Sequence, residues 1–228
     1  EPYLLGQIEH KIIEKYIESN TEWNEEKHIV LTKGILKQTI DKNKLLISDN
    51  RFKTYLIEAM NYSRAGIEYL FGLRNILGDI DFLFEVDIKD QNHQGSIDCI
   101  IKGDFGVGII DFKRSIAGIP SAREVLTYSK IQLLYYLTHF QQDPLKYKFF
   151  GYVNLSEISK SRLFSTVPEI EYDDPGNISE LIEGYKNKEK NLIEVIKSDK
   201  NFYPVPKNKT VCKFCIVSKV CTRNKEQE

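Results

Sequence analysis

Two aspartates and a lysine fall within one short, mostly apolar stretch of the chain. Asp98 precedes Asp111 with twelve residues between them, and Lys113 follows Asp111 after a single residue. Because a buried charge without a partner is costly, we expect these side chains to bind one another or a metal ion. Carboxylates are ligands that Mg²⁺ and Mn²⁺ prefer, and such a cation can polarise a phosphoryl oxygen and activate water. The pattern therefore favours metal-dependent phosphodiester hydrolysis.

Further ligands can be assigned from the neighbouring sequence. The backbone carbonyl of Phe112 lies between Asp111 and Lys113 and can supply a third oxygen, and the imidazole of His10 is acceptable to Mn²⁺. Lys113 would position the attacking water or stabilise the charge that develops on the phosphorus centre. For His10 the alternative is a hydrogen-bonded histidine in the core.

The elements that must position these residues begin with a β-hairpin. Strands are predicted at 96–101 and 107–113, joined by a glycine-rich turn, and a strictly alternating strand at 79–88 precedes them to form a meander. Alternation places Asp111 and Lys113 on one face, and Asp98 on the face opposite to Ile97, Cys99 and Ile101. Glu85 is predicted to be an exposed residue of the edge strand, with an extra acid at the site as the alternative.

Helices are predicted on both sides of this hairpin. A helix at 4–17 carries two apolar stripes, one of which includes His10, so it should be covered on two sides. Helices are also expected at 33–46, at 51–71 as one helix or a pair, at 121–140 with Ser121 as N-cap, and at 178–197. Strands are expected at 146–155, reached by a right-handed parallel crossover, and at 162–172. The basic residues Arg51, Lys53 and Arg64 are interpreted as a solvated face rather than phosphate contacts.

Composition limits the number of domains and the type of protein only broadly. The chain has 228 residues, of which 41% are hydrophobic and 29% charged, as in one folded domain. No run approaches the roughly 18 apolar residues that a membrane span needs, and no leader opens the chain, so we expect a cytoplasmic protein without a membrane partner. The net charge of -1 neither favours nor excludes nucleic acid. Because the sequence starts at Glu1 without methionine, we expect a fragment of a longer protein.

Three of the four cysteines lie close together near the C-terminus. Cys212, Cys215 and Cys221 have the spacing C-x2-C-x5-C, which in a reducing compartment favours metal ligation over disulfides. They are one ligand short of a zinc or iron–sulfur site, and we expect the fourth ligand before Glu1. Cys99 is better explained as a small core residue. Unligated thiols are the alternative for the cluster.

Taken together, these motifs resemble the RecB-like branch of the PD-(D/E)XK nucleases. The matching parts are G-x-x-x-H at Gly6–His10, G-x-x-D at Gly95–Asp98, D-x-K at Asp111–Lys113, and Q-x-x-x-Y at Gln132–Tyr136. The cysteine spacing is similar to the iron–sulfur motif of AddB-type subunits and CRISPR-associated exonucleases. The family's first cysteine, which precedes the histidine motif, is absent from this chain.

The resemblance implies a restriction-endonuclease-like α/β fold, with a mixed central β-sheet flanked by helices. It implies metal ligation by His10, Asp98 and Asp111, and catalysis by Lys113. Gln132 and Tyr136 would line the catalytic site and help hold the DNA strand or the lysine, with an ordinary helix interior as the alternative. The cysteines would hold a [4Fe-4S] cluster. One nuclease domain is expected, with a helical layer at about 1–78, a sheet core at about 79–172, and a C-terminal helix and cysteine-rich tail at about 173–228.

The function implied is that of a Mg²⁺- or Mn²⁺-dependent exonuclease or endonuclease acting on DNA. It would form part of a helicase–nuclease, with a helicase subunit or domain as partner. The alternatives are an inactive DNA-binding or scaffolding domain on the same fold, and a structural zinc or cluster module.

Overall fold

Residues 2–89, 94–140, 143–170 and 176–198 are described by a computed structural model. The chain divides into two units, residues 1–185 and 186–228. The helices are α1 (Pro2–Ser19), α2 (Glu25–Lys42), α3 (Asp49–Leu77), α4 (Ala122–Leu126), α5 (Gln132–His139) and α6 (Ile178–Ser198), and the strands are β1 (Ile80–Lys89), β2 (Gln94–Gly103), β3 (Gly106–Lys113), β4 (Tyr147–Asn154) and β5 (Arg162–Ser165).

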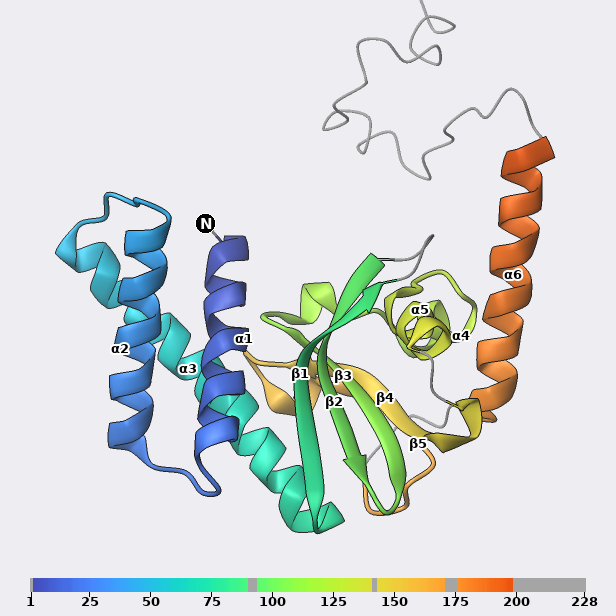
Figure 1. The fold of residues 1–228 in the computed structure, drawn as a ribbon, viewed down its shortest axis with the longest axis horizontal. Helices are drawn as coiled ribbons and strands as arrows, with labels where there is room; N and C mark the ends of the chain where they lie inside the picture. The colour runs from blue at the N-terminus through green and yellow to red at the C-terminus, as the bar shows by residue number, and fades with distance from the viewer. Residues whose placement is uncertain (1, 90–93, 141–142, 171–175, 199–228) are drawn as a thin grey trace, which may run out of the picture. The chain divides into compact units, whose positions relative to one another are not determined.

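The first unit is built on a five-stranded sheet in the order β1-β2-β3-β4-β5 (Figure 1). The meander β1-β2-β3 is antiparallel, β4 lies parallel to β3, and β5 is antiparallel to β4. The predicted α/β fold with a mixed central sheet and flanking helices is therefore confirmed. The parallel pairing of β3 and β4 is also as predicted, because a helical connection of this length joins parallel neighbours.

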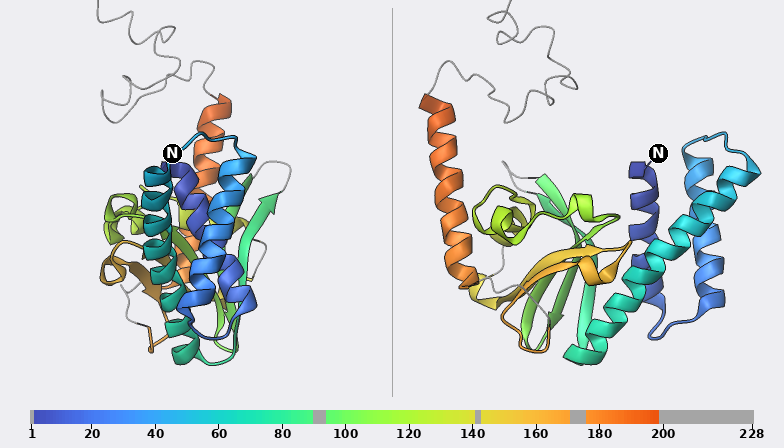
Figure 2. Two further views of the ribbon diagram at one scale, coloured as in Figure 1. Left: turned by 90° about the vertical axis from the view of Figure 1, so that its left-hand side faces the viewer. Right: turned by 180° about the vertical axis from the view of Figure 1, so that it is seen from behind.

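One face of the sheet is covered by α1 and α3, and α2 packs on these two helices. The left view of Figure 2 shows the three helices in front of the sheet, and the right view shows the molecule from behind. Helix α1 buries apolar side chains on two sides, as its double stripe predicts, and its core residues are Leu5, Ile8, Ile12, Ile13, Tyr16 and Ile17. They pack with Cys99, Ile101, Ile110 and Phe112 of the sheet in one hydrophobic core. This core sets α1, which carries His10, against the meander.

The opposite face has a second core, made with α4, α5 and the first turns of α6. Residues Ile97, Ile100, Ile109, Tyr152 and Phe164 of the sheet meet Leu133, Leu134 and Leu137 of α5 there. The placement of Ile97 corrects the prediction that it shares a face with Cys99. The alternation of side chains along β2 is interrupted at Asp98, so Ile97 faces the second core and Cys99 faces the first.

Several predicted boundaries were wrong. Helix α2 begins at Glu25, eight residues before the predicted start, where the Asn24 side chain accepts a hydrogen bond from the Lys27 backbone N–H at 3.0 Å. Helix α3 is one continuous helix rather than a pair. Strand β5 ends at Ser165, where the Ser165 hydroxyl accepts from the Val167 N–H and turns the chain away from β4.

The predicted helix at 121–140 is two helices. Ser121 caps α4 as predicted, in a capping box with Glu124. Tyr128 then takes a φ of 58°, and the N–H groups of Ser129 and Lys130 both bond to the Glu124 carbonyl. This turn ends α4 and lets α5 start at Gln132. No helix among the described residues has the length and apolar character that a bilayer crossing needs.

Candidate active site

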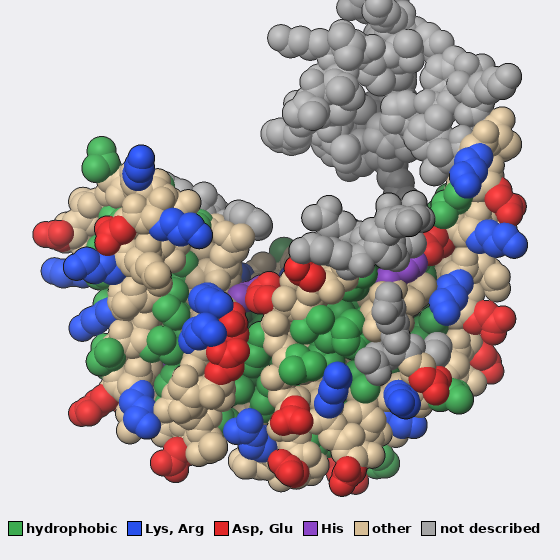
Figure 3. Space-filling view, viewed as in Figure 1, with side chains coloured by type: hydrophobic (Ala, Val, Ile, Leu, Met, Phe, Trp, Pro, Cys, Tyr) green, Lys and Arg blue, Asp and Glu red, His purple; other side chains and the backbone are tan. Residues whose placement is uncertain are grey.

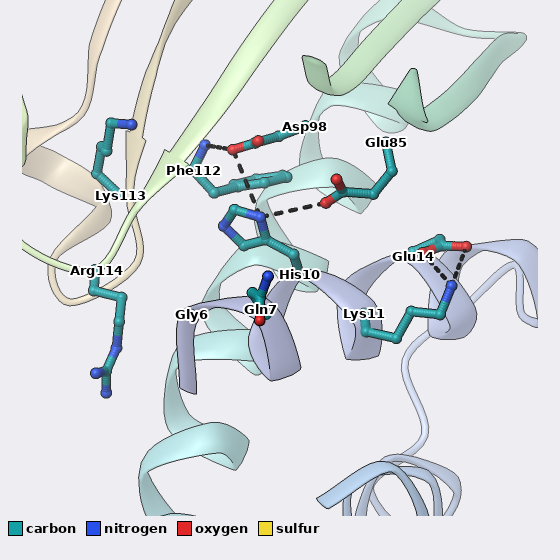
Figure 4. Close-up of a pocket in the computed structure, with 10 residues that line it drawn as sticks. All are labelled: Gly6, Gln7, His10, Lys11, Glu14, Glu85, Asp98, Phe112, Lys113 and Arg114. Atoms are coloured by element: carbon teal, nitrogen blue, oxygen red, sulfur yellow. Dashed lines mark hydrogen bonds and ion pairs between the residues drawn. The ribbon is translucent and has the colours of Figure 1, made fainter. Parts of the chain in front are cut away.

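The candidate site is a pocket of about 500 Å³ between α1 and the meander. Side chains from α1, from Glu85 of β1, from Asp98 of β2 and from the end of β3 line it (Figure 4). Acidic side chains and part of a histidine are visible at the notch between the helical layer and the sheet (Figure 3). The pocket thus collects residues that are far apart in the sequence.

The pocket forms where β2 and β3 separate. Their backbone pairing ends with Cys99 opposite Ile110, although β3 continues beside β4 to Lys113. Beyond that point the Asp98 side chain takes over from the β2 backbone as hydrogen-bond acceptor for β3. Its Oδ2 accepts a hydrogen bond from the Phe112 backbone N–H at 2.8 Å. The N–H and C=O groups of one strand residue face the same neighbour. The Phe112 carbonyl, predicted as a ligand, is therefore expected on the side of Asp98.

His10 faces two carboxylates. Its Nδ1 lies 3.5 Å from Glu85 Oε1 and 3.7 Å from Asp98 Oδ2, and its ring meets the Phe112 ring edge-on (Figure 4). Burial disfavours the charged imidazole, but the hydrogen bond with Glu85 and the charge of Asp98 outweigh it and raise the pKa of His10 to about 9. One ligand atom from each of His10, Glu85 and Asp98 lies within 4.8 Å of the others, which is a spacing that one cation can bridge.

Glu85 is the acid whose role the sequence left undecided. It is on the edge strand and its side chain is 45% exposed, as predicted, yet its carboxylate turns toward His10. Its φ of 48° lies in the left-handed region, which is uncommon for a residue other than glycine. The pairing of β1 with β2 explains why Glu85 reaches the site. Phe84 pairs with Cys99 and Val86 with Ile97, so Glu85 lies across from Asp98.

Asp111 and Lys113 form the second half of the site, as alternation along β3 predicts. Lys113 Nζ lies 2.5 Å from Asp111 Oδ2, over the ring of Tyr152. Gln132 joins them, because its amide donates to Asp111 Oδ1 at 2.5 Å and its carbonyl accepts from Lys113 at 3.1 Å. The same amide nitrogen lies 2.9 Å from the Tyr136 hydroxyl. Gln132 of α5 therefore contacts the Asp111–Lys113 pair directly, and Tyr136 reaches it through Gln132. Of these four residues, only Lys113 is among those that line the pocket.

Electrostatics link the two halves. Burial and then the nearby charge of Asp98 raise the pKa of Asp111 to about 7, against the opposing effect of Lys113. Burial also raises the pKa of Asp98, while His10 and the Phe112 N–H oppose the rise. The buried Oδ2 of Asp111 lies 2.5 Å from the Lys113 ammonium group. The repulsion between the buried carboxylate of Asp111 and the partly buried carboxylate of Asp98 fits a divalent cation.

The cysteines divide into two cases. Cys99 is fully buried and unpaired in the first core, which confirms its interpretation as a core residue. Cys212, Cys215 and Cys221 lie outside the described residues.

Comparison with known proteins adds one finding. Residues 1–222 match the family profile described as the PD-(D/E)XK nuclease superfamily. A search of the curated proteins finds no match. The matched range contains every residue of the two halves of the site.

Proposed function

Because the chain belongs to the PD-(D/E)XK nuclease superfamily, we propose that it is a deoxyribonuclease that hydrolyses phosphodiester bonds with Mg²⁺ or Mn²⁺. The observation that carries this proposal is the meeting of the buried Asp111 carboxylate, the partly buried Asp98 carboxylate and a lysine where β2 and β3 separate. Acids placed in this way attract a hard cation, and the adjacent ammonium group can stabilise developing negative charge.

The proposed metal ligands are His10, Asp98, Asp111 and the Phe112 carbonyl. Glu85 is added to them, since its carboxylate shares the reach of His10 and Asp98. When bound, the cation would polarise a phosphoryl oxygen and make a water molecule a better nucleophile. Imidazole is more typical of Mn²⁺ than of Mg²⁺ sites, which makes Mn²⁺ the better probe.

Lys113 is the proposed catalytic residue. Its ammonium group is fixed from three sides, by the Asp111 carboxylate, the Gln132 carbonyl and the face of the Tyr152 ring. Such fixed placement lets it orient the attacking water or meet the charge that forms on the phosphate without reorganisation. Gln132 would hold this lysine and Asp111 through its two hydrogen bonds, and Tyr136 would hold Gln132.

The proposal includes the larger protein to which this nuclease would belong and its second metal centre. The order of the motifs supports a place in the RecB-like branch, as the nuclease part of a helicase–nuclease in DNA repair. A [4Fe-4S] cluster at Cys212, Cys215 and Cys221 is supported by their spacing alone.

The test is cleavage of linear single- and double-stranded DNA with Mn²⁺, comparing wild type with Asp111→Asn. The substitution keeps the shape of the side chain but removes a ligand charge, so the rate is expected to fall at least about 100-fold. Asp104→Asn, the same change at an exposed turn position of the same hairpin, is the matched control and should cleave like wild type. No cleavage by folded wild type would leave the inactive scaffold as the better account, and equal cleavage by wild type and Asp111→Asn would reject this site.

A further inference from the structure

Arg114, the residue after the proposed catalytic lysine, connects three elements. Its Nε lies 3.0 Å from Glu9 Oε2 on α1, and its Nη2 donates to Glu58 Oε2 on α3 at 3.0 Å. The guanidinium also stacks over Tyr62 of α3, 4.7 Å from the ring centroid. The end of β3 is thereby tied to two helices of the layer. We call Arg114, Glu9 and Glu58 the clamp.

Glu9 is the unusual member of the clamp because its side chain is completely buried. Its Oε2 lies 3.0 Å from the Nε of the Arg114 guanidinium. Removing the cationic partner of a buried acid is strongly destabilising. The contact between α1 and β3 therefore depends on Arg114.

A phosphate-binding role fits Arg114 less well. Its side chain borders the pocket and is 26% exposed, but its guanidinium already faces two carboxylates. A phosphate group would have to approach both acids. The planar fork of arginine, which can contact two acceptors at once, is used here between protein groups.

The position of the clamp in the chain suggests its role. Glu9 immediately precedes His10, and Arg114 immediately follows Lys113. Among the proposed ligands, His10 alone comes from the helical layer, while Glu85, Asp98, Asp111 and Phe112 come from strands that are held by their own pairing. The distance from His10 to the sheet carboxylates thus depends on how α1 is held against β3.

We propose that Arg114 is a positioning residue that sets the metal site through α1 and His10. This inference rests on the proposed function. Arg114 would not touch the cation or the substrate; it would keep the imidazole within reach of the carboxylates. Outer residues that orient a ligand commonly change metal affinity by about 10- to 100-fold.

The test measures Mn²⁺ affinity of the folded protein from the electron paramagnetic resonance signal of free Mn²⁺. Arg114→Lys keeps the charge but loses the fork, so the dissociation constant is expected to rise about tenfold. Arg64→Lys is the matched control, because Arg64 makes a similar 2.8 Å ion pair with Glu68 on the surface of α3. Its Mn²⁺ affinity should equal that of wild type.

A double-mutant cycle separates positioning from a general loss of structure. In a His10→Ala background the imidazole is gone, so Arg114→Lys should change the Mn²⁺ dissociation constant by less than about twofold. The same tenfold loss in both backgrounds would overturn the proposal, as would wild-type affinity in Arg114→Lys alone. Should Arg114→Lys not fold, Glu58→Gln loosens the clamp from α3 and is judged by the same cycle.

The outcomes also separate this inference from the proposed function. A wild type that binds Mn²⁺ and cleaves DNA, with an indifferent Arg114→Lys variant, would overturn the role of Arg114 only. A wild type that binds no Mn²⁺ would overturn the proposed function, and the positioning role with it.

Discussion

At the scale of single residues, the site is defined by charged side chains that lie close together, His10 beside Glu85 and Asp98, and Lys113 beside Asp111. Asp111 is 1% exposed and has a raised pKa, since burial and Asp98 both disfavour its charged form. Lys113 offsets part of this cost without filling the coordination capacity of two carboxylates. The remaining negative potential is the physical reason to expect a divalent cation.

Gln132 gives a prediction at this scale, because it donates to Asp111 and accepts from Lys113. Gln132→Glu replaces the donor with a third carboxylate, which repels Asp111 and competes for Lys113, so kcat on linear DNA should fall about 100-fold. Gln132→Met removes the hydrogen bonds without adding charge and should cost only about tenfold. Both are measured at saturating Mn²⁺.

The matched control is Gln38→Glu, the same change at an exposed position of α2, which should keep wild-type kcat. Equal rates for Gln132→Glu and wild type would show that Gln132 is an ordinary residue of the helix interior.

At the scale of elements, α1 packs closely against α3, and this packing holds His10 near the carboxylates of the sheet. Gly66 of α3 permits this approach, because a Cβ there would lie 2.6 Å from Ile13 Cδ1 and 3.1 Å from Leu155 Cδ2. Gly72 of the same helix has no atom within 4 Å of such a Cβ. The two glycines therefore differ in packing but not in helical context.

We predict that Gly66→Val lowers the free energy of unfolding by about 1–3 kcal/mol, because the side chain overpacks the contact between the helices. Gly72→Val should change it by less than about 0.5 kcal/mol, since valine is no worse than glycine in a helix and meets nothing there. Urea denaturation measures both. Equal effects at the two positions would mean that α1 and α3 are not packed this closely.

The helical layer also contains a buried histidine. His28 is 1% exposed and its Nε2 lies 2.8 Å from the Ser63 hydroxyl, beside the ring of Trp23. Burial, with a smaller effect from Arg64, lowers the pKa of His28 from 6.5 to about 4. As pH falls through this window, the unfolded chain takes up a proton before the folded one does, so the folded state loses stability.

The predicted size of this loss is about 3 kcal/mol between pH 6.5 and pH 4. Because the buried acids titrate in an overlapping range, the measurement compares wild type with His28→Gln by urea denaturation at several pH values. The stability advantage of wild type should shrink by that amount as the pH falls. A difference that does not vary with pH would contradict the burial of a neutral imidazole.

At the scale of the whole molecule, sequence predicts most where one physical pattern dominates. Alternation along β3 correctly placed Asp111 beside Lys113, and the double stripe of α1 correctly predicted cover on two sides. Helix α2 was placed too late because its buried face is His28, Thr32 and Leu36, which gives little apolar periodicity, while Val30 is 71% exposed.

Other features depend on tertiary structure that no local pattern carries. The change of side between Ile97 and Cys99 lies opposite Glu85, whose φ is 48°, and β1 changes side at the same place, between Phe84 and Val86. Alternation assumes a regular strand. Glu85 and Arg114 act through contacts with α1, which is distant in sequence. The sequence therefore predicted which residues of β3 share a face, and the structure was needed to find the contacts of Glu85 and Arg114 with α1.

Asp98 and Asp111 are proposed to bind one divalent cation together. Crystals soaked in Mn²⁺ and measured for anomalous scattering test it most directly. We predict a strong peak between the two carboxylates, within coordinating reach of His10, that is lost in Asp111→Asn. A soaked wild-type crystal without a peak there, or with metal only at the cysteines, would contradict the account.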